Sequence, residues 1–506
     1  MLTPFPRPLT TSIAALIAAL ALTLALVPSA FASKSMQIGI ADEGVTQRTP
    51  ALIPQVIPQW KQVGMDVARV MIVWSYVAPD PEDSVAPNGF DPTNPNDPRY
   101  NWGVVDQTMN QLRASGIEPV VAVTGPGPIW GSSDPGFEDQ RYKPDPEQFA
   151  DFATAAAKRY GAQVDRWLIW NEPNVNQWLQ PQQTCVKGVC VPIAPSLYRG
   201  IVRAAYPALK AADPGSTVIA GTLAPRGQTP QNTRANVRPL AFLRAFACVD
   251  AKLRPERKSK YCKSGFKAPV ADGFAFHPHG TLFAPTKHLP NKDEVSLVDF
   301  GPRLLKTLDG IQKSGRFLNA GSRTKKFDIY FTEYGYQTNP PDPYQGVSTT
   351  EQLNWVQEGS YLAWRQPRVK MMIQYLWRDD PVGARGQGSA AYAGWQSGLY
   401  SFDGRKKPLR DAFPNVFWVD LPKGKKTATV WGQVRPGDSA SVTVQKKNGS
   451  SWSTLRSLRT DSKGYFAFTT AISKKTSLRY RYAMADATTA KVRTFTSSVM
   501  TVGGKR

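Results

Sequence analysis

Eight short apolar runs with helical segments between them are the feature that most constrains the fold of this chain. Each run is followed by polar residues, glycine or proline, which is typical of strands buried on both faces of a parallel sheet. The runs span residues 36–40, 67–74, 118–123, 164–170, 217–220, 273–277, 327–333 and 369–377. The helical segments span residues 52–64, 102–115, 146–160, 196–212, 297–314 and 349–365. This alternation predicts an α/β fold, a (β/α)8 TIM barrel. A doubly wound open sheet is the alternative, but no G-x-G-x-x-G motif follows the first run.

The pattern changes near Lys423, where helical periodicity ends and short alternating segments begin. These segments span residues 428–434, 441–445, 465–468 and 478–482, with turn residues between them. They predict a small antiparallel β-sandwich of immunoglobulin-like type. We therefore expect three parts: a signal peptide (1–32), a catalytic barrel (33–420) and a sandwich (421–506).

Positive charge is concentrated in the predicted sandwich. Residues 421–506 carry 17 Lys or Arg against three Asp and no Glu, a surplus of 14 out of a formal net charge of +23. A basic surface attracts anionic polymers, so an anionic cell-wall polymer or acidic polysaccharide is a possible partner. A solvated spacer is the plainer alternative. Nucleic acid would fit the charge alone, but the predicted export of the chain argues against it.

The first residues indicate a secretory signal peptide. Arg7 precedes an apolar run over residues 13–27, and Ala30-Phe31-Ala32 is an A-x-A cleavage pattern. The run is short for a membrane span. We expect the mature chain to begin near Ser33 and to be extracellular or wall-associated.

The four cysteines agree with export. Cys185, Cys190, Cys248 and Cys262 allow three pairings. We expect the neighbours to pair, Cys185 with Cys190 and Cys248 with Cys262. The absence of any C-x-x-C spacing disfavours zinc.

Two glutamates stand at the ends of predicted strands. Trp170-Asn171-Glu172-Pro173 ends the fourth run and Thr332-Glu333-Tyr334-Gly335 ends the seventh. A barrel brings the carboxyl ends of its strands to one mouth. Pro173 biases Glu172 towards an extended backbone. Facing carboxylates suit glycosidic bond cleavage, in which one protonates the leaving oxygen and the other attacks the sugar, at about 5–5.5 Å in retaining enzymes.

These two motifs resemble the signatures of the clan A glycoside hydrolases. The nearest match is family 5, the cellulase-like family, with family 39 as a near rival, and the resemblance covers roughly residues 36–413. It implies Glu172 as general acid/base and Glu333 as nucleophile. It also implies double displacement with retention, a β-linked poly- or oligosaccharide as substrate, and neither a metal nor an organic cofactor.

The resemblance also assigns supporting residues. Asn171 would bond the sugar's 2-hydroxyl, and Arg69 would pair with the nucleophile. His277 matches the family's histidine after the sixth strand, whereas His279 stands where the family commonly has Tyr. Tyr334, inside the second motif, is a further supporting residue.

Two tryptophans are expected to form sugar platforms. Trp377 closes the eighth run and matches the family's platform. Trp130 lies just past the third run, in a Gly-Pro-rich loop that looks more like that of family 39. Aromatic faces of this kind serve sugar clefts and cores alike.

Two rival interpretations remain at this stage. The first is a non-catalytic carbohydrate-binding or cell-wall-associated protein on a barrel scaffold, against which both glutamates, Asn171 and Arg69 argue. The second is a metal site built on His277-x-His279, for which the sequence places no third ligand clearly.

Overall fold

The computed structural model describes residues 33, 35–257, 259–262, 265–383, 386–472, 474–485 and 492–503. The predicted signal peptide lies outside these residues. Within them, no helix combines the length and the apolar character that crossing a membrane requires.

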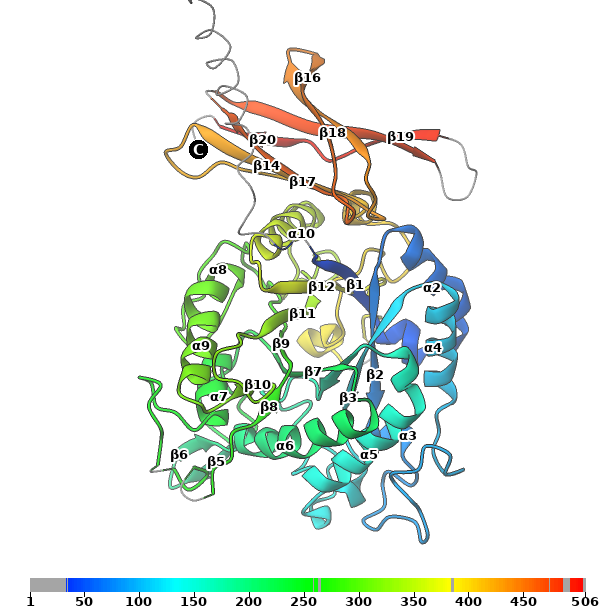
Figure 1. Cartoon of the computed structure of the whole chain (residues 1–506), viewed down its shortest axis with the longest axis vertical. Coiled ribbons are helices and arrows are strands. Elements are labelled where there is room, and N and C mark those ends of the chain that lie inside the picture. Colours follow the sequence, from blue (N-terminus) through cyan, green and yellow to red (C-terminus); the bar gives the residue numbers. More distant parts are fainter. Residues whose placement is uncertain are drawn as a thin grey trace, which may run out of the picture.

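Eight parallel strands close into a barrel, which confirms the predicted fold class (Figure 1). Each lies within or close to one of the eight apolar runs. In barrel order they are β1 (Gln37–Ala41), β2 (Val67–Val73), β3 (Glu118–Thr124), β4 (Arg166–Ile169), β7 (Thr217–Leu223), β9 (Gly273–Phe276), β11 (Asp328–Tyr334) and β12 (Val369–Tyr375). The barrel closes where β1 pairs with β12, with Gln37 opposite Met371 and Ala41 opposite Tyr375.

Helices surround the barrel, and every predicted helical segment contains one. The helices are α2 (Ile53–Gln62), α3 (Trp74–Val77), α4 (Gly103–Ala114), α5 (Pro146–Tyr160), α6 (Ala194–Ala212), α7 (Pro239–Phe246), α8 (Leu297–Asp299), α9 (Lys306–Lys313), α10 (Thr349–Trp364) and α11 (Pro408–Ala412). A π-helical segment, Phe300–Leu305, joins α8 to α9. The start of α5 shows why its limits were predictable: Pro146 is the first helical residue, and Asp145 accepts hydrogen bonds from the backbone N–H of Glu147 and Gln148.

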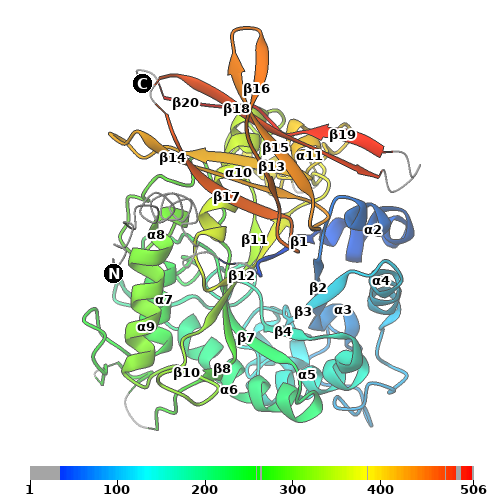
Figure 2. The same ribbon diagram turned by 45° about the horizontal axis from the view of Figure 1, so that its top comes forward.

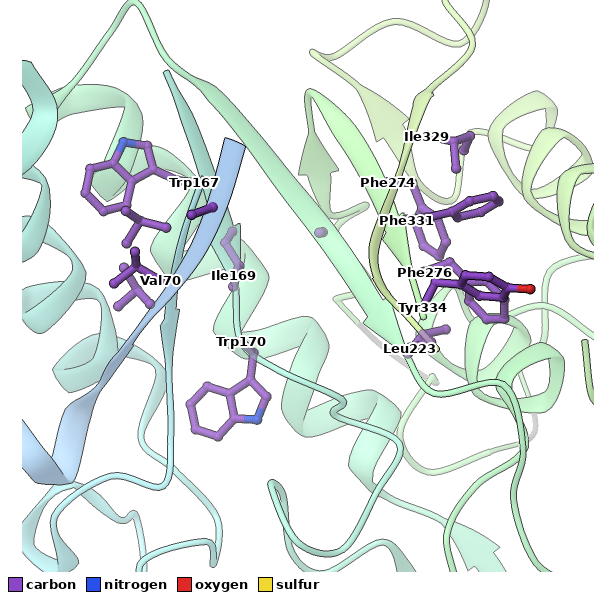
Figure 3. Close-up of a cluster of buried hydrophobic side chains, with 14 of the residues drawn as sticks. Val70, Trp167, Ile169, Trp170, Leu223, Phe274, Phe276, Ile329, Phe331 and Tyr334 are labelled. Atoms are coloured by element: carbon purple, nitrogen blue, oxygen red, sulfur yellow. The ribbon is translucent and has the colours of Figure 1, made fainter. Parts of the chain in front are cut away.

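Alternation along the strands divides the core into two layers. On β4, Leu168 points into the barrel, while Trp167 and Ile169 pack in the layer between the barrel and the helices. On β9, Ala275 belongs to the inner layer and its neighbours to the outer one. Figure 3 shows this outer layer, with Phe274, Phe276 and Phe331 gathered on one side and Trp167 on the other. Both layers are apolar, and these strands therefore appear in the sequence as continuous apolar runs.

The C-terminal part consists of two antiparallel sheets. One has the order β13 (Asn415–Asp420), β14 (Thr427–Val434), β17 (Tyr465–Ala471). The other has the order β16 (Ser451–Arg459), β15 (Ser441–Asn448), β18 (Thr476–Ala485), β19 (Val492–Thr496), with β20 (Met500–Val502) also on β18. Phe417 and Val430 of the first sheet share a core with Val444 and Leu478 of the second. Because β13 pairs with β14, these sheets begin at Asn415, ahead of residue 421.

The C-terminal sheets pack on α10 and on the start of β1 (Figure 2). Trp431 on β14 contacts Tyr361 and Trp364 on α10, with ring centroids 5.7 and 5.9 Å apart. The hydroxyl of Tyr465 donates to the carbonyl oxygen of Met36 at 3.0 Å. Helix α10 therefore lies between the barrel and the C-terminal sheets.

The cysteines pair as predicted, Cys185 with Cys190 and Cys248 with Cys262. The first bridge joins opposite residues of a hairpin, β5 (Gln183–Val186) and β6 (Val189–Pro192), in the excursion after β4. The remaining small sheet pairs β8 (Val270–Ala271) with β10 (Leu318–Asn319). Neither small sheet was predicted, because strands this short leave little alternation to detect.

Candidate active site

A sharp turn after β4 presents Glu172. Trp170 and Glu172 have positive φ angles of 69° and 38°, in the left-handed region that side chains rarely adopt. The expectation that Pro173 would keep Glu172 extended is therefore wrong. Two hydrogen bonds override this bias. One is tertiary, from the N–H of Glu172 to Thr222 O at 3.1 Å, and the other closes a local turn, from Val175 N to the carbonyl of Glu172 at 2.9 Å.

A bulge in β11 presents Glu333. Phe331 is opposite Met372 and Tyr334 is opposite Gln374, so β11 carries one more residue than β12 over this interval. An extra residue re-aims the side chains around it. Glu333 consequently faces the barrel mouth, while Tyr334 points outward and donates through its hydroxyl to Trp355 O at 3.1 Å.

The two carboxylates meet at the mouth, with His277 between them. Glu172 and Glu333 present oxygens within 4.8 Å of each other. Nδ1 of His277 lies 3.0 Å from Oε1 of Glu172 and 3.6 Å from Oε1 of Glu333, and its Nε2 lies 2.9 Å from Oγ1 of Thr332. This separation suits a carboxylate that attacks the sugar directly, because inverting pairs stand about 6.5–9.5 Å apart to admit a water.

Arg69 on β2 connects the nucleophile candidate to a third carboxylate. Its Nη1 contacts Oε1 of Glu333 and donates to Oδ1 of Asn171 at 3.1 Å. Its Nη2 donates to Oε1 of Glu43 at 2.7 Å. The Arg69 side chain is fully buried, so the guanidinium is shared between two buried anions in a site with little water to screen it.

This arrangement keeps Glu333 ionised. Burial opposes its charge, but Arg69, then His277, and a 2.9 Å hydrogen bond to His279 outweigh it and hold the pKa of Glu333 well below its usual range. Burial likewise opposes the charge of Arg69, and Glu333 and Glu43 outweigh it and raise the pKa of Arg69. His279 thus forms a hydrogen bond with Glu333 at the position where the sequence resemblance predicts a Tyr.

The carboxylates open into a cavity of ≈ 370 Å³. Trp178, Tyr375 and Trp395 contribute aromatic wall, and the ring of Trp395 lies 4.4 Å from that of His279. At the rim, an ion pair joins Arg48, after β1, to Asp380, after β12. The cavity therefore combines apolar ring faces with convergent polar groups, as sites for sugars and other small molecules do.

The structure brings six of the predicted residues together: Arg69, Asn171, Glu172, His277, His279 and Glu333. It does not bring Trp130, Trp377 or Tyr334 to the cavity lining. Trp130 packs edge-on against Trp74 at 5.8 Å and donates to Pro79 O, and Trp377 packs on Tyr400 at 5.0 Å. These positions correct the expected platforms: both rings serve the core, which an aromatic at a strand end can do equally well.

Sequence reasoning missed Glu43 and Trp178, and it left Trp395 open between the core and a sugar platform. Glu43 is 3% exposed and lines the cavity, and its Oε2 has no hydrogen-bond partner among the described residues. Asp42-Glu43 follows an apolar strand, as Asn171-Glu172 does, so the same strand-end signal applied to it. The two tryptophans lie in irregular loops, where an aromatic carries no positional signal.

One group of four side chains has the spacing of a metal site. Ligand atoms of Glu172, His277, His279 and Glu333 all lie within 4.8 Å of one another. However, the charged Nη1 of Arg69 already contacts Oε1 of Glu333, and a divalent cation beside that guanidinium would meet strong repulsion. Two hydrogen bonds, between His277 and Glu172 and between His279 and Glu333, already engage these four side chains.

No protein-family profile matches the sequence, and no curated protein matches it either. Solved structures with some similarity include a glucosidase from Croceicoccus marinus, at 12% identity and a TM-score of 0.48 over 87% of this chain and 94% of that one. Another is a family 39 β-xylosidase from Caulobacter crescentus, at 16% identity and a TM-score of 0.46 over 83% and 84% of the two chains. A third is a β-glucuronidase from Bacteroides uniformis, at 9% identity and a TM-score of 0.41 over 92% of this chain and 46% of that one. At this level of similarity, the reaction that the site performs is inferred from its own side chains alone.

Proposed function

We propose that this protein is a retaining glycoside hydrolase of clan A that cleaves a β-linked poly- or oligosaccharide by double displacement. Within that clan we propose family 5 or family 39, whose signatures the two glutamate motifs resemble. The observation that carries the proposal is the pair of carboxylates, with oxygens within 4.8 Å, of which one is held ionised by a buried arginine.

In the first step, Glu333 attacks the anomeric carbon while Glu172 gives its proton to the leaving glycosidic oxygen. The bond from carbon to that oxygen breaks, and a covalent glycosyl ester forms on Glu333. In the second step, Glu172, now ionised, takes a proton from water, which attacks the anomeric carbon and releases Glu333. Glu172 is the more accessible of the two, with its side chain 16% exposed against 7% for Glu333, as exchange of its proton requires.

The cavity suggests how the sugar is held. Asn171, whose Oδ1 is fixed by Arg69, lines the cavity next to Glu172 and would bond the 2-hydroxyl. Oε2 of Glu43, which has no hydrogen-bond partner among the described residues, would accept a hydrogen bond from a second hydroxyl. Trp395 and Trp178 offer faces for the apolar side of the ring.

We further propose that the protein is exported after removal of residues 1–32. Both disulfides support this, because such bridges persist in oxidising compartments.

The test is hydrolysis of a panel of aryl glycosides and polysaccharides, with NMR of the first-formed anomer. Glu333→Ala and Glu172→Gln are expected to lower turnover by orders of magnitude, and the wild type is expected to release the anomer of the substrate's own configuration. The matched control is Glu147→Gln, an exposed carboxylate on α5, which should leave turnover unchanged. Undiminished turnover in both site variants, or release of the inverted anomer, would overturn the proposal. Saturable sugar binding without cleavage across the panel would favour the non-catalytic alternative.

A further inference from the structure

The second C-terminal sheet, with the order β16-β15-β18-β19, leaves one of its faces to solvent. Val444 on β15 points into the core that this sheet shares with the first one. Side chains alternate along a strand, so Thr443 and Gln445 point the other way. Arg481 and Arg479 of β18 are their opposite partners on that side. The first sheet lies between this sheet and α10, so the solvent-facing surface points away from the barrel (Figure 1).

This surface, which we call the outer face, carries positive charge without a counter-ion among the described residues. Its cations are Lys447 of β15, Arg459 of β16, and Arg479 and Arg481 of β18. The strands β15, β16, β18, β19 and β20 contain no Asp or Glu. Within the described part of the chain, none of these cations forms an ion pair. Partial burial and the charge of Arg481 lower the pKa of Arg479, as expected where like charges lie close together.

Arg479 is held in place on the outer face. Its Nε donates to Oε1 of Gln445 at 2.9 Å, and its Cζ lies 4.1 Å from the ring centroid of Trp452 on β16. Neither Nη group has a hydrogen-bond acceptor among the residues that the structure describes, and Arg479 is partly exposed. A guanidinium fixed in this way loses less rotamer freedom when it binds an anion than a free arginine would.

Arg481 repeats the charge along the same strand. It lies two residues after Arg479, roughly 6.8 Å further along β18 and on the same face, and it is exposed. The hydroxyl-bearing Ser457, Thr443 and Thr496 share its row across the sheet. Each arginine can donate two parallel hydrogen bonds to a carboxylate, and the neighbouring hydroxyls can bond to hydroxyl groups on the same partner.

This combination fits one class of partner. An open sheet face with charges in successive rows suits an extended polymer, and carboxylates flanked by hydroxyls are the chemistry of acidic sugars. We propose that the outer face binds an acidic polysaccharide through its carboxylates, with Arg479 and Arg481 as the principal anchors.

Two other anionic partners fit the outer face less well. Proteins that bind single-stranded nucleic acid offer aromatic rings on which bases stack, whereas the ring of Trp452 is already stacked by Arg479. A bilayer surface is bound through apolar side chains that enter it. The rows of Arg479 and Arg481 present none among the described residues, only Thr454 and Gln445 in the first and hydroxyls in the second.

The position of the outer face indicates a role in tethering. It points away from the barrel and shares no residue with the catalytic cavity. A polymer bound there would hold the enzyme on an anionic matrix and raise its local concentration without filling the cavity. The inference does not depend on hydrolysis, so binding and turnover can fail separately.

The experiment is titration calorimetry of the full chain with polygalacturonate and with its methyl ester, which keeps the sugar backbone but removes the charge. Polygalacturonate should bind saturably, about tenfold or more tightly than the ester, and more weakly as salt is added. Replacing both arginines, Arg479→Gln with Arg481→Gln, should weaken this binding about tenfold or more. Turnover of aryl glycosides and thermal unfolding should stay unchanged, because both side chains point away from the core.

The matched control is Lys423→Gln with Lys425→Gln. These exposed residues lie in the turn between β13 and β14, so the pair removes the same charge from the same domain but not from the outer face. It should change the affinity little. Three results would each overturn the inference: polygalacturonate that binds no more tightly than its ester, equal losses in the two double variants, or equally tight binding of double-stranded DNA or anionic lipid vesicles at the same salt concentration.

Discussion

Replacing Arg69 by Met is the most direct perturbation of the site's electrostatics. The change keeps an unbranched side chain but removes the guanidinium that Glu333 and Glu43 share. Both residues are buried, with 5% and 3% of the whole residue exposed for Glu333 and Glu43, so water cannot replace the lost partner. The effect should therefore appear both in the charge state of Glu333 and in the stability of the fold.

The size of the effect follows from the geometry. Two unit charges about 4 Å apart attract by about 4 kcal/mol at an effective dielectric constant of about 20, which is equivalent to about three pKa units. In the wild type, the depressed pKa of Glu333 contributes stability above the carboxyl's ordinary pKa, and this contribution is lost as the pH falls through the depressed value. In Arg69→Met, burial is no longer outweighed, so the acid limb of kcat/KM should move to higher pH by as much as about three units. The free energy of unfolding at neutral pH should fall by about 3–5 kcal/mol, because two buried carboxylates lose the guanidinium that they share.

The assay is a pH–rate profile on an activated aryl glycoside, paired with urea unfolding. Adding Glu43→Gln to Arg69→Met removes one of the unpaired charges and should restore part of the stability, which a double-mutant cycle would measure. Arg159→Met, at a partly exposed pair with Asp106, is the control and should cost no more than about 1 kcal/mol with no change in the acid limb. An acid limb of Arg69→Met that coincides with that of the wild type would refute the electrostatic reasoning.

Three further predictions concern a buried ion pair, the cavity wall and one disulfide. Lys407→Met should destabilise the fold by about 3–5 kcal/mol, because Lys407 pairs at 2.8 Å with Asp379 and both side chains are buried. Burial already raises the pKa of Asp379 to about 6 despite Lys407. Below that pH the carboxyl is protonated in the folded state, so the loss in free energy of unfolding, measured with urea, should be smaller there. Trp395→Ala should raise KM about tenfold, with kcat less affected, because a ring face for the sugar is lost; an unchanged KM would remove Trp395 from the binding wall. Replacing Cys248 and Cys262 together by Ala should cost about 3 kcal/mol, since the bridge closes a loop with a sequence separation of 14. Thermal unfolding with and without a reductant checks this, and a variant as stable as the oxidised wild type would contradict it.

The barrel was predictable because its strands are buried on both faces. Residues such as Trp167, Leu168 and Ile169 are all apolar although they point alternately to two layers, so each strand stands out as a run. The pairing of Glu172 with Glu333 was also within reach, because strand order alone places both ends at one mouth.

The positions of several site side chains could not be predicted, because they depend on local backbone geometry. Nothing in the sequence marks the bulge in β11, yet without its extra residue Glu333 would not face inward. The prediction of Trp377 and Trp130 as sugar platforms failed for a related reason. All three tryptophans, Trp395 included, carry the same side chain, and only the path of the loops decides which ring reaches the cavity. The left-handed turn at Glu172 could not be predicted, because a hydrogen bond to Thr222, which is distant in sequence, helps to hold the backbone against the bias of Pro173.

The contact between Tyr465 and Met36 bears on how the protein can be divided. A shortened protein that stops before β13 would lose the donor that holds the backbone just before β1. It would also leave the rings of Tyr361 and Trp364 without Trp431, which would favour aggregation. Expressing the barrel by itself would therefore yield a destabilised protein, and poor activity of such a fragment would report on lost support rather than on a catalytic part played by the removed sheets.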